Sequence, residues 1–534
     1  MNDLMQAEFG TVAQAIHQHA VQSPARRALV EATGEGSRTL TYAQLDGMMD
    51  RVAAALQRDG VQPGQAVAIC ANTSLEYAAV FLGALRAAVV VAPLAPSSTP
   101  ASLARMLADA DARLVFTDAA NAGLLAASPS GITQIMLDDS AAGMTLSNWL
   151  ATVGAGTASG AAAAQAVKPV QVEPSWPFNI IYSSGTTGEP KGIVQSHGMR
   201  WTHVRRGDAY QYGADTVMLL STPLYSNTTL VVFFPALAFG GTVVLMPKFD
   251  AAGYLKLAQA HRATHTMLVP VQYQRLRARP DFDAHDLSSF KFKFCTSAPF
   301  AAALKADVLK RWPGGLVEFY GMTEGGGSFI LEAHLHPAKL HTVGRAAEGH
   351  DIRLIDDNGR QVAQGEAGEV VGHSPGMMLG YHRQPEKTRE AEWFDASGKR
   401  FIRTGDIGRL DAEGFLTLFD RKKDMIISGG FNVYPSDLEA VLREHPGVLE
   451  AAVVGMPSEQ WGETPVAFVV LQPGQAASPD GLLQWVNQRV GKTQRVAAVH
   501  LLQELPRSAI GKVLKRELRD QYRPGGTDSA AMAP

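Results

Sequence analysis

The ten residues SSGTTGEPKG, numbers 183 to 192, combine three glycines, four hydroxyl side chains and one lysine. Glycines permit tight turns close to a ligand, hydroxyls donate hydrogen bonds, and the lysine supplies a fixed positive charge. The apolar stretch Phe178 to Tyr182 before them is typical of a buried strand, and a segment starting near His197 could form a helix. A strand, a glycine-rich loop and then a helix would direct N–H groups at a phosphate. Taken alone, the loop fits an ordinary surface turn equally well.

Four further segments carry residues suited to nucleotide chemistry. Tyr320 to Glu324 ends in a hydroxyl and a carboxylate, which suit a phosphate oxygen and a magnesium ion. The RTGD run, Arg403 to Asp406, places a carboxylate after a glycine turn, where it can accept hydrogen bonds from sugar hydroxyls. Arg421 and Lys512 add positive charges. Each alone has an ordinary explanation as a solvated charge, a linker charge or a turn, but their joint occurrence favours one nucleotide site.

The elements that position these residues alternate between strands and helices. Thr41 and Gln44 have the spacing of a helix-capping box. The apolar patterns then predict strands over 66–71, 89–94 and 114–118 and helices over 75–87 and 102–110. This rhythm predicts a mainly parallel sheet covered by helices, and therefore an α/β fold.

Two composition changes divide the chain. Residues 151–168 are almost entirely Ala, Gly, Ser and Thr, which indicates a low-complexity connector. DRKKD, residues 420–424, concentrates charge between apolar runs. Beyond it we expect a small α+β domain, with a disordered tail over the last ten residues. Its predicted elements are helices over 436–444 and 481–490 and strands over 451–455 and 466–471.

The composition excludes several classes of protein. A chain of 534 residues is too long for one core, and a formal net charge of -3 carries no signature of nucleic-acid binding. Two cysteines, Cys70 and Cys295, argue against a disulfide framework and suit a reducing cytoplasm. The uncharged stretch from Ser226 to Pro247 is broken by Pro235 and by a glycine pair, which favours buried structure over a membrane span. The first residues, MNDLMQAEFG, are not typical of a secretory signal, so a soluble cytoplasmic protein is expected.

The ordered series SSGTTGEPKG, YGMTE, RTGD, DRKKD and PRSAIGK resembles the motif set of the adenylate-forming superfamily. That group contains acyl- and aryl-CoA synthetases, nonribosomal peptide adenylation domains and beetle luciferases. The resemblance runs from about residue 25 to residue 520. It implies a large N-terminal domain of two α/β subdomains plus a β-barrel (1–420), a hinge (421–424) and a small mobile C-terminal domain (425–534).

The resemblance also implies a reaction in two steps. A carboxylate attacks the α-phosphate of ATP, giving an acyl-adenylate and pyrophosphate, and the thiol of coenzyme A then displaces AMP. Because the attacking group and its target are both anionic, catalysis would consist mainly of charge neutralisation and positioning. The expected cofactors and partners are ATP, Mg²⁺, coenzyme A and a small carboxylic acid, without nucleic acid; a homodimer stays open.

The roles implied for individual residues follow the motifs. The β- and γ-phosphates would be held by Ser183, Ser184, Gly185, Thr186, Thr187 and Gly188, with Lys191 nearby. Thr323 would contact the α-phosphate and Glu324 would bind magnesium. The adenine would lie against Tyr320, Gly321 and Met322, with its edge at Ser297, Ala298 and Pro299. Asp406 and Arg421 would bind the ribose hydroxyls.

The small domain would contribute to both steps. The ammonium of Lys512 would bridge the substrate carboxylate and the α-phosphate during adenylation. Lys423 matches the hinge position, which must absorb a large backbone change. The bare backbone of Ser428, Gly429 and Gly430 would let the pantetheine arm pass.

The acyl pocket is expected around Tyr225 and Ser226 and at Gly325, Gly326 and Gly327, where missing side chains would leave room for the substrate; the glycines would equally serve a turn. Many relatives have His where Ser226 stands, so the gating role of that position is doubtful here. The segment 226–246 contains no charge, which predicts a neutral-bodied aromatic or medium-chain monocarboxylic acid. Tyr225, Phe233 and Phe234 lean toward an aromatic one.

Three functions remain open at this point. A CoA ligase is favoured, because the segment Tyr225 to Thr229 lacks the acid that amino-acid-activating relatives carry. The alternatives are an enzyme that loads its acid onto a carrier protein, and a non-catalytic or light-emitting relative.

Overall fold

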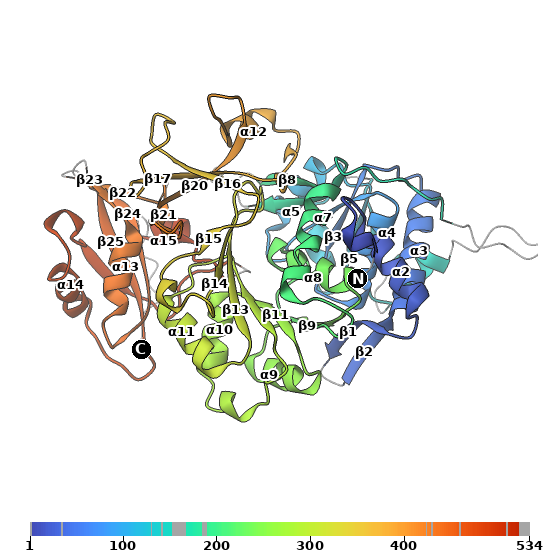
Figure 1. The fold of residues 1–534 in the computed structure, drawn as a ribbon, viewed down its shortest axis with the longest axis horizontal. Helices are drawn as coiled ribbons and strands as arrows, with labels where there is room; N and C mark the ends of the chain where they lie inside the picture. Colours follow the sequence, from blue (N-terminus) through green and yellow to red (C-terminus); the bar gives the residue numbers. More distant parts are fainter. Residues whose placement is uncertain are drawn as a thin grey trace, which may run out of the picture. The chain divides into compact units, whose positions relative to one another are not determined.

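The computed structural model describes residues 3–33, 36–129, 131–139, 143–151, 167–183, 190–422, 424–428, 431–458, 461–508 and 511–522. The chain forms a larger and a smaller compact unit (Figure 1). The first comprises Met1–Ile352 and Gly372–Arg403, and the second comprises Arg353–Val371 and Thr404–Pro534. The predicted hinge residue Lys423 lies outside the described residues, so a hinge at 421–424 stays a prediction.

A nine-stranded sheet in the first unit has the order β15-β14-β13-β12-β11-β9-β10-β1-β2. Its strands are β1 (Arg27–Thr33), β2 (Gly36–Thr41), β9 (Val217–Leu220), β10 (Thr242–Leu245), β11 (His265–Leu268), β12 (Phe292–Cys295), β13 (Gly315–Tyr320), β14 (Phe329–Glu332) and β15 (Arg345–Ala346). The strands from β13 to β1 pair in parallel. Their carboxyl ends therefore meet at one edge, where loops with ligand-binding residues are expected.

A seven-stranded sheet has the order β18-β8-β7-β4-β3-β5-β6. Its strands are β3 (Ala66–Cys70), β4 (Val90–Pro93), β5 (Leu114–Thr117), β6 (Thr133–Met136), β7 (Pro177–Ser183), β8 (Lys191–Ser196) and β18 (Gly380–Tyr381). Strands β3, β4, β5, β6 and β7 pair in parallel, which confirms the predicted parallel sheet.

The arrangement around the glycine-rich loop differs from the prediction. Strands β7 and β8 are antiparallel, so the loop joins two strands of a hairpin, and helix α7 (His197–Arg205) begins only after β8. The helix expected near His197 is confirmed, but strand β8 separates it from the loop. Ile193 and Val194 after the loop are buried, because β8 lies between β7 and β18.

Helices cover these sheets and confirm the predicted helical segments. Besides α7 they are α1 (Asp3–Gln6), α2 (Val12–Gln22), α3 (Tyr42–Arg58), α4 (Leu75–Arg86), α5 (Pro100–Asp109), α6 (Leu146–Ala151), α8 (Asn227–Ala238), α9 (Ala251–Ala260), α10 (Pro270–Arg277), α11 (Ala302–Arg311) and α12 (Pro385–Glu390). The capping box at the start of α3 is present, with Thr41 and Gln44 each bonding the other's backbone N–H. The uncharged stretch after Ser226 forms α8 and β10, and no helix of the described residues is long and apolar enough to span a membrane.

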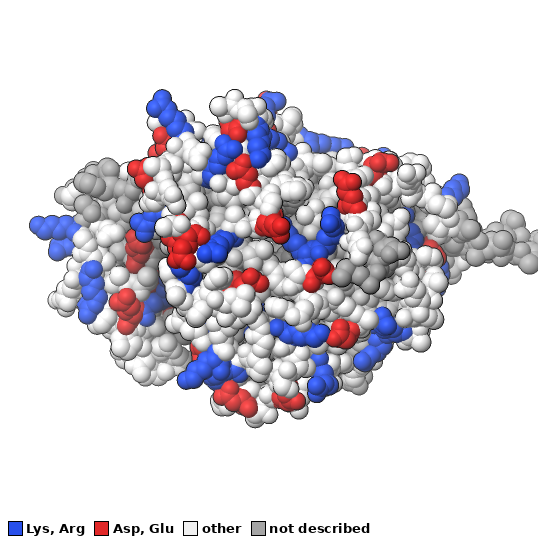
Figure 2. Space-filling model, viewed as in Figure 1, with Lys and Arg blue, Asp and Glu red and all other residues white. Residues whose placement is uncertain are grey.

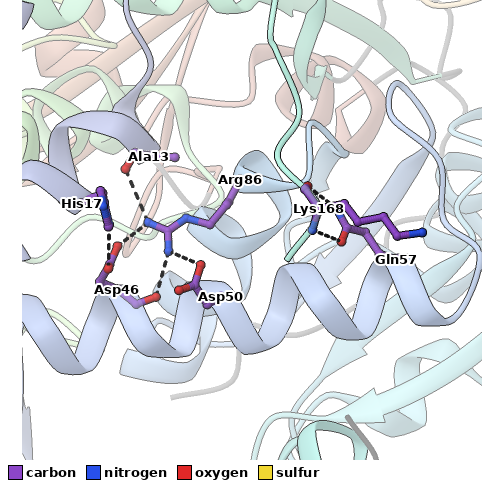
Figure 3. Close-up of polar contacts among 7 residues, drawn as sticks. All are labelled: Ala13, His17, Asp46, Asp50, Gln57, Arg86 and Lys168. Atoms are coloured by element: carbon purple, nitrogen blue, oxygen red, sulfur yellow. Dashed lines mark hydrogen bonds and ion pairs between the residues drawn. The ribbon is translucent and has the colours of Figure 1, made fainter. Parts of the chain in front are cut away.

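Helices α2, α3 and α4 are joined by a cluster of charges (Figure 3). Arg86, at the end of α4, donates to the backbone oxygen of Asp46 (2.9 Å) and to the Asp50 carboxylate (2.7 Å), and it also pairs with the Asp46 carboxylate. His17 of α2 contacts the other oxygen of that carboxylate at 3.0 Å. The charge of Arg86 is therefore matched within the fold.

The sequence after residue 350 supplies further sheets. The third sheet has the order β16-β17-β20-β19 with β21 on β20, and the division between the units passes through β16, β17 and β20. Its strands are β16 (Asp351–Ile355), β17 (Ala367–His373), β19 (Glu392–Phe394), β20 (Arg400–Leu410) and β21 (Leu416–Arg421). The sheet adds β structure beyond the two large sheets, and the β-barrel expected within residues 1–420 stays a prediction.

The fourth sheet, in the second unit, has the order β23-β22-β25-β24 with β26 on β25. The elements of this region are β22 (Ile426–Ser428), β23 (Phe431–Val433), α13 (Pro435–Arg443), β24 (Val448–Ser458), β25 (Gly462–Leu471), α14 (Pro479–Asn487), β26 (Ala498–Leu501) and α15 (Lys515–Gln521). They confirm the predicted small α+β domain. Most of the connector 151–168 and all of the last ten residues lie outside the described ranges.

Charges of both signs are interspersed over the described part of the face in Figure 2. This distribution agrees with the small net charge of -3.

Candidate active site

The two ends of the glycine-rich loop are fixed side by side. Ser183 and Lys191 are direct partners at the ends of β7 and β8. The Lys191 ammonium lies 5.0 Å from the centre of the Tyr381 ring. Residues 184–188, to which phosphate contacts were assigned, lie outside the described residues, so those contacts stay a prediction.

Tyr381 connects this lysine to Glu324. Its hydroxyl donates a hydrogen bond to Glu324 Oε1 at 2.9 Å. Burial, with the Glu324 carboxylate beside it, raises the pKa of the Tyr381 hydroxyl, which therefore keeps its proton and remains a donor. Strand β18, paired with β8, brings Tyr381 to this position. The sequence analysis missed Tyr381, since no spacing rule relates two residues 57 positions apart.

The predicted magnesium ligand fits the chemistry of the ion. Glu324 is oriented by a second residue, as metal-binding carboxylates commonly are. The described residues contain no cluster of three or more His, Cys, Asp or Glu side chains that could form a complete metal site. Magnesium is commonly held by one or two carboxylates together with substrate phosphates, so a lone oriented Glu324 suffices.

A chain of buried amides supports Thr323. Its carbonyl accepts from Gln195 Nε2 (2.7 Å), and Gln195 Oε1 accepts from Asn179 Nδ2 (3.1 Å). Asn179 Oδ1 in turn accepts from Arg200 Nε (2.9 Å). These contacts link α7, β7 and β8 to the YGMTE segment, and sequence reasoning missed them because they join distant residues.

The residues assigned to adenine lie at adjoining strand ends. Tyr320 ends β13, and Ser297 follows β12, its parallel neighbour; Ala298 and Pro299 continue that loop. Ser297 has a φ of 80°, which is uncommon for a residue with a side chain, and its hydroxyl lies 2.5 Å from that of Thr228. Such a conformation persists where the surroundings hold it, often at functional sites.

The two residues after Tyr320 lie next to the hairpin. Met322 packs against a cluster formed by Ile193, Met378, Tyr381 and Ile402. A Cβ placed on Gly321 would lie 3.2 Å from the Ser328 hydroxyl. Their contact with adenine remains a prediction.

The glycine run 325–327 does not leave open space. A Cβ on Gly325 would collide with the Gly376 carbonyl, and one on Gly326 would lie 2.8 Å from the Gly372 carbonyl. A Cβ on Gly327 would meet the Ile352 side chain. Gly325 and Gly326 also have φ values of 75° and 84°. Protein atoms occupy the positions that side chains would take at these three residues, so close backbone packing explains the glycines, and their contact with the acyl group stays a prediction.

The segment around α8 also differs from expectation. Ser226 is the N-cap of α8, and its hydroxyl accepts from Thr228 N (3.3 Å). Phe233 and Phe234 are 1% exposed, and Phe234 packs against Phe178 with ring centres 5.2 Å apart. These two phenylalanines are part of the core, which removes them as stacking partners. Tyr225, after β9, is only partly buried.

The second unit brings the two predicted ribose residues together. Asp406 on β20 and Arg421 on β21 are opposite each other, and Arg421 Nε lies 3.0 Å from Asp406 Oδ1. The RTGD run is part of strand β20 rather than a turn; only Gly405 departs from extended geometry, with a φ of 69°. A sugar hydroxyl bound here would contact a carboxylate and a guanidinium that already form an ion pair with each other.

The remaining predicted residues of this unit lie in short hairpins. Ser428 is buried at the end of β22, whereas Gly429 and Gly430 are not described. Lys512 is exposed on a turn in which the Ser508 N–H donates to the Lys512 carbonyl (2.8 Å) and the Lys512 N–H to the Ser508 hydroxyl (3.2 Å). The turn holds the backbone and leaves the ammonium at the surface of the unit.

Comparison with known proteins identifies relatives over nearly the whole chain. Residues 16–382 match the family described as AMP-binding enzyme, and residues 437–512 match its C-terminal domain. An indoleacetate–CoA ligase of Aromatoleum aromaticum is 34% identical, covering 90% of this chain and 93% of the relative. The fatty acid–[acyl-carrier-protein] ligase ScoC of Streptomyces coeruleorubidus is 31% identical, covering 98% of each. The crystal structure of ATP-bound MatB from Rhodopseudomonas palustris has a TM-score of 0.84 at 29% identity, covering 96% of this chain and 99% of that one.

Proposed function

The chain belongs to the AMP-binding enzyme family, and from that membership we propose that it is an ATP-dependent carboxylic acid–CoA ligase. It forms an acyl-adenylate with release of pyrophosphate, and then an acyl-CoA thioester with release of AMP. The observation that supports the proposal is that Tyr381 contacts both predicted residues: its hydroxyl donates to the Glu324 carboxylate, and its ring lies 5.0 Å from the Lys191 ammonium. A match to ATP-bound MatB over the full length supports it.

In the first step the protein positions two anions. Lys191 and the glycine-rich loop hold the terminal phosphates, and Thr323, fixed by Gln195, lies at the α-phosphate. Glu324 would hold Mg²⁺, which would supply positive charge to the phosphates. The Lys512 ammonium neutralises the charge that builds between the acid and the α-phosphate. Asp406 and Arg421 orient the ribose.

In the second step a thiol replaces AMP. We assign the hinge to Lys423 and the passage of the pantetheine arm to Ser428, Gly429 and Gly430. Coenzyme A is the proposed acceptor, because the indoleacetate relative is a CoA ligase. The likeness to ScoC favours a second candidate, transfer to a carrier protein. Thioester formation with coenzyme A, measured beside the same assay with a carrier protein, separates the two.

The proposed acid has a largely apolar aromatic or medium-chain body. Helix α8, which follows Tyr225, carries no charged side chain, and the name of the first relative gives an aromatic acid. Pyrophosphate release over a panel of aromatic and aliphatic acids, with coenzyme A present, tests the proposal. Absence of acid-dependent pyrophosphate release across that panel would contradict it.

A further inference from the structure

Helix α7 carries a basic side chain at every third position. These are His197, Arg200, His203 and, at the C-cap, Arg206. With 3.6 residues per turn, consecutive members of this series lie about 60° apart around the helix axis, so its two ends, His197 and Arg206, lie on opposite sides. Within the part of the chain that the structure describes, none of the four forms a hydrogen bond or ion pair with a carboxylate, and Nη1 and Nη2 of Arg200 have no hydrogen-bond partner. Arg200 and Arg206 thus carry positive charge on α7 without a matching acid among the described residues, whereas burial lowers the pKa of His197 and of His203, so both rings are neutral near pH 7.

The contact between Arg206 and His350 sets two hydrogen-bond donors against each other when the imidazole is neutral. Arg206 Nη2 lies 3.0 Å from His350 Nε2, and the Ser328 N–H donates to His350 Nδ1, also at 3.0 Å. Burial and the charge of Arg206 lower the pKa of His350 to about 4, so the ring is neutral near pH 7. A neutral imidazole has one acceptor nitrogen. Since Ser328 uses it, the ring N–H at Nε2 and the guanidinium N–H face each other, and both are donors.

His265 shows that the fold satisfies a buried histidine where the role is structural. Its Nε2 lies 2.8 Å from the Tyr210 carbonyl, and its Nδ1 lies 2.8 Å from the Thr264 hydroxyl. One tautomer, with the proton on Nε2, suits both neighbours. In the Arg206–His350 pair, by contrast, each donor would have an acceptor only if a further acceptor group lay between them.

The donor pair lies near the predicted phosphate residues. Ser328, which holds His350, follows Glu324 by four positions, a distance that an extended chain covers in about 14 Å at most. His203 Nε2 lies 3.8 Å from the Cβ position of Gly376, whose carbonyl packs against Gly325. An acid whose carboxylate reacts beside Glu324 would need a body of about this length to reach the pair.

We propose that Arg206 and His350 form a subsite for a hydrogen-bond-accepting oxygen on the body of the acid, remote from the reacting carboxylate. An oxygen between the two donors accepts from both and removes their conflict. The shared chemistry is an oxygen acceptor, whether a neutral hydroxyl or a second carboxylate. The inference rests on the proposed ligase function and narrows its substrate to oxygen-bearing acids.

The test uses acids that differ only at the far end. One series is 4-methylcinnamate, 4-hydroxycinnamate and 4-carboxycinnamate, and the other is octanoate, 8-hydroxyoctanoate and octanedioate. Pyrophosphate release gives kcat/KM for each, and the thermal shift caused by each acid reports binding without turnover. The full-length protein should prefer an oxygen-bearing member by at least about tenfold, as expected when a site built to bond an oxygen meets an analogue without it. Comparison of the hydroxyl-bearing acids with the carboxylate-bearing acids shows which oxygen group the subsite prefers.

Substitutions test whether Arg206 and His350 cause the preference for oxygen-bearing acids. Arg206→Met should reduce the preference at least about tenfold, whereas Arg205→Met, its exposed neighbour, should keep it. If circular dichroism shows that Arg206→Met does not fold, His350→Leu takes its place, with His350→Gln as the conservative variant that restores part of the preference. Turnover without preference, or equal preference in Arg206→Met and Arg205→Met, overturns the inference and leaves the ligase function standing. No turnover of any acid overturns the ligase function itself, and the inference with it.

Discussion

Arg86 and Arg200 are two buried arginines of the same unit with opposite surroundings. The Arg86 side chain is 11% exposed and is bound by Asp46 and Asp50 (Figure 3). Arg200 is 1% exposed, lies 5.7 Å from the centres of the Phe178 and Phe234 rings, and has one amide partner, Asn179. Desolvation by burial lowers the pKa of Arg200 to about 9.

The comparison distinguishes two kinds of buried charge: charges that stabilise the fold, and charges whose burial lowers its stability. A buried charge without its opposite costs several kcal/mol, whereas a matched one roughly breaks even. Arg86 belongs to the first kind, since its removal leaves two carboxylates without their partner. Arg200 on α7 belongs to the second, and so we expect the unmatched charges of α7 to serve a ligand. Variants at both kinds of position test this division.

The largest effect is expected for Lys512→Ala. Lys512 is exposed on a turn, so its loss should leave the stability unchanged. Adenylation should fall by about 1000-fold or more, because the charge acts in the transition state. Conversion of a pre-made acyl-adenylate with coenzyme A to thioester should survive much better. Lys492→Ala, an exposed lysine of the same unit, is the control. Equal loss of both half-reactions would contradict the role assigned to Lys512.

A matched pair of substitutions tests the comparison directly. Arg86→Met should lower the free energy of unfolding by roughly 3 kcal/mol, because it leaves Asp46 and Asp50 without their cation. Arg200→Met should change it by less than about 1 kcal/mol, since the desolvation cost disappears along with one hydrogen bond. Urea midpoints of both variants measure the difference. A larger loss for Arg200→Met than for Arg86→Met would mean that α7 is structural.

A smaller effect is expected where a neutral group supports a charge. Tyr381→Phe removes the hydroxyl that orients Glu324. The Mg²⁺ concentration for half-maximal pyrophosphate release should rise by about tenfold, as for other residues that orient a metal ligand. Tyr254→Phe, which removes a buried hydroxyl bonded to Thr266 at 2.7 Å, is the control. An unchanged Mg²⁺ requirement would contradict the assignment of Glu324 as a magnesium ligand.

Some features of the fold and of the candidate site could be predicted from the sequence, and others could not. The parallel strands, the capping box at Thr41 and the small second domain follow from local periodicity, so they could be predicted. The Asp406–Arg421 pair could be expected from the motifs alone. Tyr381 and Gln195 could not, because pairing between distant strands brings them to the site.

The glycine run left two explanations open, room for the substrate or a turn, for a related reason. An absent side chain in a sequence suggests free space, but only the fold shows what fills it. At Gly325 and Gly326 the filler is backbone of residues 376 and 372. Likewise an aromatic residue in a sequence suggests a stacking surface, and the fold buries Phe233 and Phe234 instead.

The mildest test concerns the histidines, which the fold keeps neutral in both kinds of surroundings. Burial lowers the pKa of His265 and of His350 to about 4. From about pH 6.5 down to about pH 4 the unfolded chain therefore binds protons that the folded chain does not, so stability falls as pH falls, by at most about 1.4 kcal/mol per pH unit for each histidine. Urea unfolding between pH 6.5 and 5 should show this slope, and His265→Asn should make it shallower. An oxygen-bearing acid that binds between Arg206 and His350 should change the contribution of His350 and leave that of His265 as it was. A slope that is flat in the parent, or identical in His265→Asn, would mean that His265 is not held neutral.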